Sequence, residues 1–444
     1  MKPAVVYLGL GTNVGSNLLM NLDLVFHKLV RDAKVRVLDS SHAYLSKATV
    51  LGQLEPKHGD YLNAVLKVET LLSPPLLLAY LKDLERKQFL RDPNQPRHAS
   101  RTMDLDILLY GSGQRFDAPD LVIPHPRMGE RDFVLLPLGD VMPRTKPLPT
   151  GVQRTVRGTV ASYGPNLTWV RGEACKRVGI INATPDSFSD GGLLQTISPA
   201  ERAKEMMLGG RADCLDVGGE STRPNAPPVG EQQEIDRVLP IIHSCLPYCQ
   251  AISIDTTKPG VAQAALDAGC TVVNDVSGGS NTELVRLVGK TPGANLVLMH
   301  SKGTPETMDS LATAGDRDIV STVAAELLSK VTRAVQSCQV PRWRVIIDPG
   351  IGFAKTHEQS MQLLLGADLL RRKVDGNIPV MIAHSRKRFL KTQLLGLETD
   401  AQDWPSIGAR EEINFKATEL AIQHGADLVR IHLANTMQQT IKGS

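Results

Sequence analysis

The chain has 444 residues, a formal net charge of +3, and an ordinary globular composition with 42% hydrophobic and 22% charged residues. This length predicts two or three domains. The balanced charge argues against wholesale neutralisation of a nucleic-acid backbone and against a polybasic membrane patch, and no run approaches the roughly 18 apolar residues of a membrane span.

The six cysteines are scattered, without a Cys-x-x-Cys pair or neighbouring histidine pairs at zinc-ligand spacing. We expect reduced, mostly buried thiols rather than metal ligands. The N-terminus, "MKPAVVYLGLGTN", suits a first strand better than a signal peptide, because its one lysine precedes a short apolar run that ends in glycines. These features predict a cytoplasmic, reducing compartment.

Short strand-like runs alternate with helical patterns in the first part of the chain. The strand-like runs are VVYLGLG, RVLDSSHAY, YLNAVLKVET and DLDILLYG, and the helical patterns cover about 17–31 and 74–89. This succession predicts a ferredoxin-like α+β domain over 1–145, in which helices cover one face of a mostly antiparallel sheet.

The stretch "RTMDLDILLYG" places Asp104 and Asp106 two residues apart in an apolar run. In a strand, side chains at this spacing point to the same face. Two adjacent carboxylates repel each other and lose hydration, so either one takes up a proton or a cation lies between them. The alternative is an exposed edge strand with solvated charges.

A segment rich in proline and glycine over 146–174 predicts a linker. In the following domain, 175–444, eight apolar runs alternate with helical segments. The runs are VGIINAT, CLDVGGES, AISIDTT, TVVNDVSG, NLVLMHS, RVIIDPG, PVMIAHS and DLVRIH. Continuous apolar strands are typical of parallel sheets that are buried on both faces, and eight β-then-α units predict a (β/α)₈ TIM barrel.

Polar residues stand at the carboxyl ends of these runs, where catalytic groups lie in that fold. They are Asn182, Asp216, Asp255, Asn274, His300, Asp348, Ser385, Arg430 and His432. Oxygen acceptors such as Asp255 and Asp348, near Lys387, suit a flat heterocycle rich in N–H donors, such as a 2-amino-4-oxo pterin. Arg223 facing Arg430 and His432 would make a site for phosphate or pyrophosphate.

The motifs of the second domain resemble dihydropteroate synthase, in order, over 178–432. They are "NATPDSFSDGG", "DVGGESTRP", "SIDTTKP", "NDVSGG", "MHSKGTPETM", "DPGIGFAK", "HSRK" and "VRIH". The resemblance implies that p-aminobenzoate displaces pyrophosphate from the hydroxymethyl carbon of a dihydropterin. The leaving group would be stabilised by Mg²⁺, Arg223 and His432, while positioning matters more than general base catalysis for a weak arylamine nucleophile.

The same resemblance implies three groups of site residues in the barrel. The pterin would contact Asp255, Asn274, Asp348, Lys387 and Arg430. Pyrophosphate would contact Asn182, Arg223, Arg430 and His432, with Mg²⁺ on Asn182. The aminobenzoate would be bordered by Phe188, Thr222, Pro224 and Ser385. Lys387 and Arg223 would be catalytic. The chain departs from the family at Leu433, where Asp is usual, and at "EINFKATELA", which replaces a small Gly-Ser stretch.

The first domain resembles hydroxymethyl-dihydropterin pyrophosphokinase from residue 4 to about 140, through "GLGTNVG", "YLNAVLKVET", "RTMDLDILLYG" and "VIPHPRMGERDFVLLPL". A dinucleotide fingerprint at "GLGTNVG" is disfavoured by its glycine spacing. The resemblance implies that Asp104 and Asp106 bind two Mg²⁺ ions carried by ATP, which hard oxygen ligands suit. The chain departs from this family at His98 and Asp120, and its loop "LSKATVLGQLEPKHGD" is longer than usual.

The remaining residues of the kinase site follow from the same resemblance. Tyr61 and Phe133 would sandwich the pterin, and Asn63 would bond its edge. The triphosphate would be held, and transfer from its β-phosphorus with release of AMP stabilised, by Arg91, Arg101, His125 and Arg131. Taken alone, the two aromatic residues would be core residues and His125 a turn residue.

The leading hypothesis is therefore a bifunctional folate-biosynthesis enzyme whose first domain makes the pyrophosphate ester that the second consumes. It would act on ATP, a dihydropterin and p-aminobenzoate, and on neither nucleic acid nor membrane; a homodimer through the barrel helices is left open. One alternative is a pterin-dependent methyltransferase barrel, which cobalamin dependence would reveal. Another is a non-catalytic pterin-binding first domain, which an assay for AMP would exclude.

Overall fold

The computed structural model describes residues 2–47, 59–89, 102–142, 156–164, 167–183, 198–221, 228–303, 318–396 and 406–432. The chain divides into two compact units, each described by itself below. The first unit contains residues 1–172 together with two later segments, 289–293 and 333–344, and the second contains the rest.

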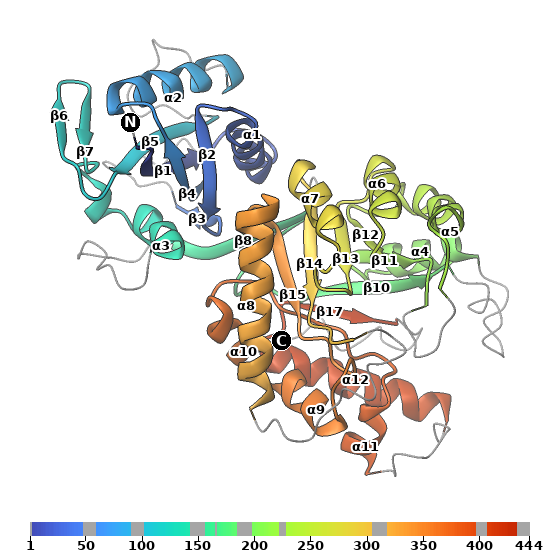
Figure 1. Cartoon of the computed structure of the whole chain (residues 1–444). Coiled ribbons are helices and arrows are strands. Elements are labelled where there is room, and N and C mark those ends of the chain that lie inside the picture. Colours follow the sequence, from blue (N-terminus) through green and yellow to red (C-terminus); the bar gives the residue numbers. More distant parts are fainter. Residues whose placement is uncertain are drawn as a thin grey trace. The chain divides into compact units, whose positions relative to one another are not determined.

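The first unit is built on an antiparallel sheet whose main order is β5-β1-β4-β3-β8-β9, with β2 paired to β4 (Figure 1). Its strands are β1 (Ala4–Thr12), β2 (Val35–Ser40), β3 (Tyr44–Ser46), β4 (Tyr61–Thr70), β5 (Asp104–Tyr110), β8 (Val156–Gly164) and β9 (Leu167–Val170), beside a separate hairpin of β6 (Phe116–Ala118) and β7 (Leu121–Ile123). Its helices are α1 (Leu18–Val30), α2 (Pro74–Phe89) and α3 (Asp132–Val141), with a 3₁₀ turn at Met128–Glu130.

Helices cover both faces of this sheet. Alternate residues of β1, β4 and β5, such as Leu8 and Leu66, pack with α1 and α2 in one core. The intervening residues, such as Val65 and Leu108, pack with α3 in a second, smaller core. The expectation that helices cover one face is therefore wrong for α3, which lies on the other.

Part of the predicted linker is regular structure. Strand β8 pairs with β3 and with β9, so residues 156–164 and 167–170 extend the first sheet. The apolar positions of these short strands lie among prolines and glycines, which hides their period in the sequence.

The late segment 333–344 supplies buried partners to the first unit. Asp23 of α1, which is 0% exposed, accepts hydrogen bonds from Trp343 Nε1 at 2.8 Å and from Arg344 Nε at 2.9 Å. Arg342 forms an ion pair with Asp39 at 3.0 Å. Trp343 belongs to the core of this unit. These residues are more than 300 positions away from their partners in the sequence.

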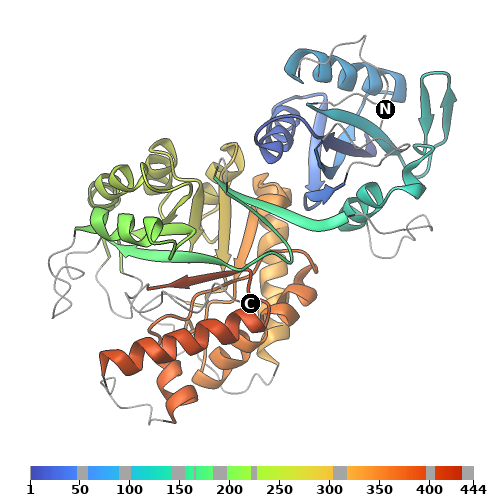
Figure 2. The same cartoon turned by 180° about the vertical axis from the view of Figure 1, so that it is seen from behind.

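The second unit is a parallel eight-stranded barrel with strand order β15-β14-β13-β12-β11-β10-β17-β16 (Figures 1 and 2). A parallel bridge between Ile347 and Val380 joins the two end strands. The strands are β10 (Lys176–Asn182), β11 (Cys214–Gly218), β12 (Ile252–Asp255), β13 (Val272–Asp275), β14 (Asn295–Met299), β15 (Val345–Asp348), β16 (Met381–Ile382) and β17 (Leu428–Ile431). They coincide with the eight apolar runs, so the barrel prediction is confirmed.

The helices of the second half are α4 (Pro199–Leu208), α5 (Glu231–Cys245), α6 (Pro259–Asp267), α7 (Thr282–Lys290), α8 (Ile319–Cys338), α9 (His357–Leu365), α10 (Ala367–Val374), α11 (Phe389–Leu395) and α12 (Ile407–Gln423), with a 3₁₀ turn at Arg342–Arg344. Capping boxes start α4 at Ser198 and α9 at Thr356, where side chains satisfy the first free backbone N–H groups. In the described part of the chain, no helix has the length and apolar character needed to cross a membrane.

Candidate functional site

The two carboxylates of β5 lie on one face of the first sheet, as their spacing predicts. Asp104 and Asp106 alternate with Leu105, whose side chain is buried on the opposite face with α1 and α2. On β1, Gly11 stands opposite Asp104, and Gly9 stands opposite Asp106. Since glycine has no side chain, neighbouring side chains come close to the backbone here: Leu108 lies over Gly9, and Asn63 lies beside Gly11.

Other predicted kinase residues lie on this same face. Asn63 of β4 is directly across Gly11 from Asp104, and Tyr61 stands two residues before it on the same strand. His125 is tied to β5 because its backbone N–H donates to the Leu108 carbonyl at 3.0 Å.

The start of α3 adds a cation and an aromatic ring to this face. Arg131 is the N-cap of α3, and its guanidinium lies 5.6 Å from the ring centre of Phe133. Phe133 packs against the α3 core, which is on the same side of the sheet as the carboxylates. The sheet and α3 therefore gather acids, bases and aromatic residues on one surface.

The charges of the two carboxylates repel each other, and this disfavours the ionised form of Asp106. Burial and the neighbouring charge of Asp104 raise the pKa of Asp106, while Lys82, His125 and Arg131 oppose the rise. Lys82 Nζ is 3.8 Å from Asp104 Oδ1. Among the described residues, no group of three or more His, Cys, Asp and Glu side chains could hold a metal ion. Hard divalent cations favour oxygen donors such as these two carboxylates.

Sequence reasoning missed the buried carboxylate that anchors β5. Glu85 of α2 is 0% exposed, accepts the backbone N–H of Leu105 at 2.8 Å and pairs with Lys82 at 2.7 Å. This anchor holds the strand segment between the two aspartates. Its signal in the sequence is only one acidic residue on the apolar face of a helix, which has no distinctive motif.

In the second unit, side chains from four strands meet around one guanidinium. Arg430 of β17 donates from Nε to Asp216 Oδ2 and from Nη2 to Asp255 Oδ2, the second at 2.6 Å. Asn274 donates to Asp216 at 3.2 Å. Burial raises the pKa of Asp255 to about 7; Arg430 opposes this rise and Asp216 adds to it.

Asp216 is among the polar residues that the sequence places at the strand ends, but it was assigned to no substrate. It is 1% exposed, and no described residue hydrogen-bonds to its Oδ1 atom. A buried carboxylate oxygen without a partner is costly unless a ligand or water supplies a donor. Asp216 is the middle residue of β11, and a lone carboxylate inside a short apolar strand is the signal that would have identified it.

Asp348 and Lys387 lie together beside this cluster. Asp348 is 2% exposed, and its Oδ1 accepts the backbone N–H of Gly350 at 2.7 Å. Burial raises the pKa of Asp348, and the charge of Lys387 is the largest opposing influence. Lys387 Nζ donates to the Ile351 carbonyl and lies 4.8 Å from the ring centre of Phe353.

A third group lies at the ends of β10, β16 and β17. The Ser385 hydroxyl accepts the backbone N–H of His432 at 3.1 Å and lies 3.2 Å from its ring Nδ1. Asn182 is the exposed last residue of β10. Six predicted site residues fall outside the described parts of the chain: Arg91, Arg101, Phe188, Thr222, Arg223 and Pro224.

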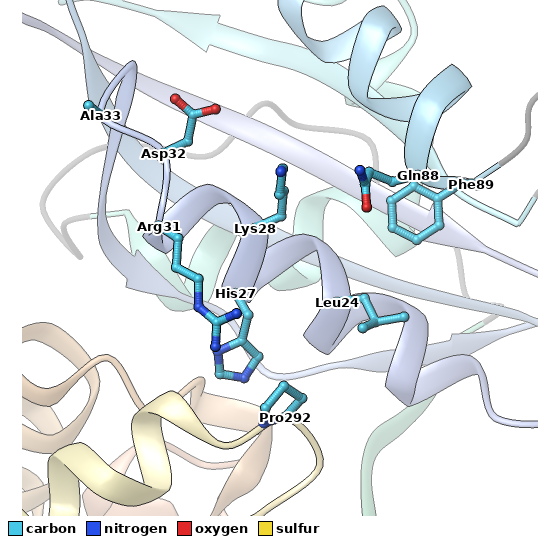
Figure 3. Close-up of a pocket in the computed structure, with 9 residues that line it drawn as sticks. All are labelled: Leu24, His27, Lys28, Arg31, Asp32, Ala33, Gln88, Phe89 and Pro292. Atoms are coloured by element: carbon cyan, nitrogen blue, oxygen red, sulfur yellow. The ribbon is translucent and has the colours of Figure 1, made fainter.

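A hollow of about 500 Å³ lies elsewhere in the first unit (Figure 3). It is lined by Leu24, His27, Lys28, Arg31, Asp32, Ala33, Gln88, Phe89 and Pro292. These residues come mainly from α1 and the end of α2, on the opposite face of the sheet from Asp104 and Asp106. The hollow is therefore separate from the candidate site.

Comparisons with known proteins agree with this geometry. The model of the 7,8-dihydro-6-hydroxymethylpterin-pyrophosphokinase family matches residues 7–143, and the pterin binding enzyme model matches 178–432. A folate synthesis bifunctional protein of Arabidopsis thaliana is 31% identical over 96% of this chain and 92% of its own length. A dihydropteroate synthase of Synechocystis is 37% identical over 60% of this chain and 87% of its own length.

Solved structures share the fold along nearly the whole chain. The HPPK-DHPS of Plasmodium falciparum, solved with pteroate, has a TM-score of 0.73 and 19% identity over 97% of this chain and 95% of its own. Another HPPK-DHPS, solved in complex with substrates, has a TM-score of 0.74 and 19% identity over 97% of both chains. The chain thus belongs to the bifunctional folate-synthesis family, in which a hydroxymethyldihydropterin pyrophosphokinase domain precedes a dihydropteroate synthase barrel.

Proposed function

We propose that the two units catalyse consecutive steps. The first transfers pyrophosphate from ATP to 6-hydroxymethyl-7,8-dihydropterin and releases AMP. The second joins the pterin product to p-aminobenzoate and releases pyrophosphate. The observation that carries this proposal is the cluster of Asp216, Asp255 and Arg430 beside Asp348 and Lys387, because such alternating acceptors and donors suit the edge of a pterin ring.

In the first unit, Asp104 and Asp106 would hold Mg²⁺ that accompanies ATP, and the raised pKa of Asp106 marks a site where added positive charge is favourable. The ion, when bound, neutralises charge that develops on the triphosphate. Arg131 and His125 lie on the same face and would bind phosphate oxygens. Burial lowers the pKa of His125, so its ring is neutral near pH 7 before substrate binds.

The pterin of the first reaction would lie between Tyr61 and Phe133, where offset stacking on aromatic rings is favourable. Asn63 would bond its edge. Asn63 is positioned for this role because its amide donates to the Ser46 hydroxyl at 2.9 Å. Orientation of the hydroxymethyl oxygen toward the β-phosphorus is the contribution expected of these three residues.

In the barrel, Asp348, Asp255 and Asn274 would bond the pterin ring, with Lys387 beside them. We assign Arg430 mainly to the pterin side, because two carboxylates already neutralise its charge. Pyrophosphate, together with Mg²⁺ on Asn182, would lie toward His432 and Arg223. Ser385 orients His432 and would border the aminobenzoate with Phe188, Thr222 and Pro224.

Two further proposals concern assembly and compartment. The helices of the barrel expose several large apolar side chains, Leu365, Leu369, Leu395 and Ile407, which supports a homodimer through these helices. Light scattering of the purified protein tests it.

All six cysteines are free thiols, which supports a reducing, cytosolic compartment.

The whole chain, ATP, Mg²⁺, hydroxymethyldihydropterin and p-aminobenzoate should give AMP and dihydropteroate in equal amounts. Asp104→Asn should stop AMP formation and Asp348→Asn should stop dihydropteroate formation alone. Dihydropteroate formation by Asp104→Asn should return when pterin pyrophosphate is supplied. Failure of that rescue, or loss of AMP formation in Asp348→Asn, with folding intact, would contradict the division of the two reactions between the units.

A further inference from the structure

A buried lysine lies just beyond the candidate pterin site and has no role in the proposed reaction. Lys355 follows the turn after β15 and is 7% exposed. Its Nζ atom donates to the carbonyls of Gly350 and Phe353, both at 2.9 Å, and lies 3.0 Å from His300 Nδ1. The three contacts match the three N–H donors of an ammonium group.

The neighbouring histidine has one tautomer that satisfies this arrangement. His300 Nε2 lies 3.0 Å from Glu326 Oε2, and Lys302 pairs with the other oxygen of Glu326 at 2.8 Å. Burial, assisted by the charge of Lys355, lowers the pKa of His300 to about 3. A neutral ring that donates from Nε2 to the carboxylate accepts at Nδ1, so Lys355 must supply the hydrogen there.

The turn that Lys355 fastens carries contacts of both predicted pterin residues. The Gly350 N–H bonds Asp348, and the Ile351 carbonyl accepts from Lys387. Gly350 has φ of 64°, and a Cβ atom there would clash with the His300 carbonyl. The turn is thus a conformation that needs glycine and is held by the ammonium of Lys355.

We propose that Lys355, in its protonated form, is a positioning residue that fixes the turn 349–354 and so sets the places of Asp348 and Lys387 for the pterin. This inference rests on the proposed function of those two residues. No contact between Lys355 and the substrate is required. If the ammonium loses a proton, only two N–H donors remain for three acceptors, and one of the hydrogen bonds that hold the turn is lost.

Burial and the charges around Lys355 bring the pH at which it loses a proton close to neutral. Burial lowers the pKa of Lys355 to about 7; the charge of Asp348 opposes the shift, while Lys387, Lys302 and Lys330 add to it. The three hydrogen bonds of the Lys355 ammonium therefore form below pH 7, and one of them is lost as the pH rises through 7. Lys387 has a pKa of about 8, also lowered mainly by burial, and titrates in the same direction, so a variant is needed to separate the two.

The experiment compares Lys355→Met with wild type in the full-length protein. Calorimetry with 6-hydroxymethylpterin, and separately with Mg-pyrophosphate, is run from pH 5.5 to 9. We expect Lys355→Met to weaken pterin binding at pH 6 by about tenfold to a hundredfold, the effect of a misplaced contact. Pyrophosphate binding should be unchanged and the alkaline decline near pH 7 should disappear. Lys373→Met, an exposed cation of α10, is the matched control.

Two further variants keep the outcome decisive. His300→Leu removes one of the three acceptors, so the two N–H donors of a neutral amine match the two carbonyls that remain. The alkaline decline near pH 7 should therefore disappear in this variant, which also tests the inference if Lys355→Met does not fold. An unchanged alkaline decline in His300→Leu, or wild-type pterin binding in Lys355→Met, overturns it. Asp348→Asn runs in parallel: if that variant also binds pterin normally, the proposed pterin site itself is wrong, whereas its loss of binding beside a normal Lys355→Met refutes the positioning role alone.

Discussion

Replacing Asp216 with Asn tests the charge balance of the candidate pterin site. Asp216 and Asp255 share the guanidinium of Arg430, so two negative charges face one positive charge. The substitution keeps the size and shape of the buried side chain and removes one of the negative charges. Because Asp216 adds to the raised pKa of Asp255, the variant should lower that pKa from about 7.

The size of this shift follows from the geometry. Both carboxylates bind the same guanidinium. In general, two unit charges about 4 Å apart interact by about 4 kcal/mol at an effective dielectric constant near 20, or about three pKa units, which we take as the upper limit. Relaxation of the guanidinium reduces this, so we expect a decrease of about one to three units. The raised pKa means that Asp255 is an ionised acceptor above pH 7 and loses this form as the pH falls; the variant should extend the ionised range downward.

The assay is calorimetric binding of 6-hydroxymethylpterin between pH 5 and 8.5. We expect the acid decline in affinity to move to lower pH in Asp216→Asn, while Asp236→Asn, which changes an exposed residue of α5, should leave it in place. If Asp216 Oδ1 also accepts a pterin N–H, affinity at pH 8 should fall by about 1–3 kcal/mol. If pterin affinity declined at the same low pH in wild type and in Asp216→Asn, the charge of Asp216 would not raise the pKa of Asp255, and the reasoning would be refuted.

Three further predictions concern other parts of the chain. Asp104→Asn should abolish AMP formation yet leave dihydropteroate formation from supplied pterin pyrophosphate unchanged; near-normal AMP release would contradict the metal assignment. Arg344→Leu should lower the free energy of unfolding of the first unit by about 3–5 kcal/mol in urea titrations, since it leaves the Asp23 carboxylate buried without its cation; adding Asp23→Leu should restore most of the loss, and an effect below about 1 kcal/mol would count against the ion pair. The Cys214 thiol, whose pKa burial raises, should resist alkylation at pH 8 until the protein unfolds, as mass spectrometry of labelled peptides would reveal; rapid labelling of the native protein would mean that this thiol is accessible.

The sequence predicted those features that depend on a local period. Eight continuous apolar runs became the eight barrel strands because burial on both faces leaves no alternation to confuse with a helix. The same-face placement of Asp104 and Asp106 followed from the two-residue period of a strand. Both inferences needed only a few neighbouring residues.

Features that depend on distant partners were not predictable in this way. The position of α3 on the second face depends on which side the chain crosses, and helix periodicity does not specify it. The sharing of Arg430 between Asp216 and Asp255 joins three strands and requires the barrel register. Asp23 lies on the buried side of a helix, where its charge has no local explanation until Arg344 is brought to it.

The three-segment construction of the first unit also bears on its biosynthesis. Asp23 leaves the ribosome early, but Trp343 and Arg344 follow 320 and 321 residues later. At about 5–20 residues per second, this separation corresponds to about 16–64 s during which the nascent unit lacks the partners of a carboxylate that is buried in the finished protein. Strands β10 to β14 are synthesised within that interval. The part of the protein that is translated first is therefore completed late, and until then its α1 surface is open to chaperones and to incorrect contacts.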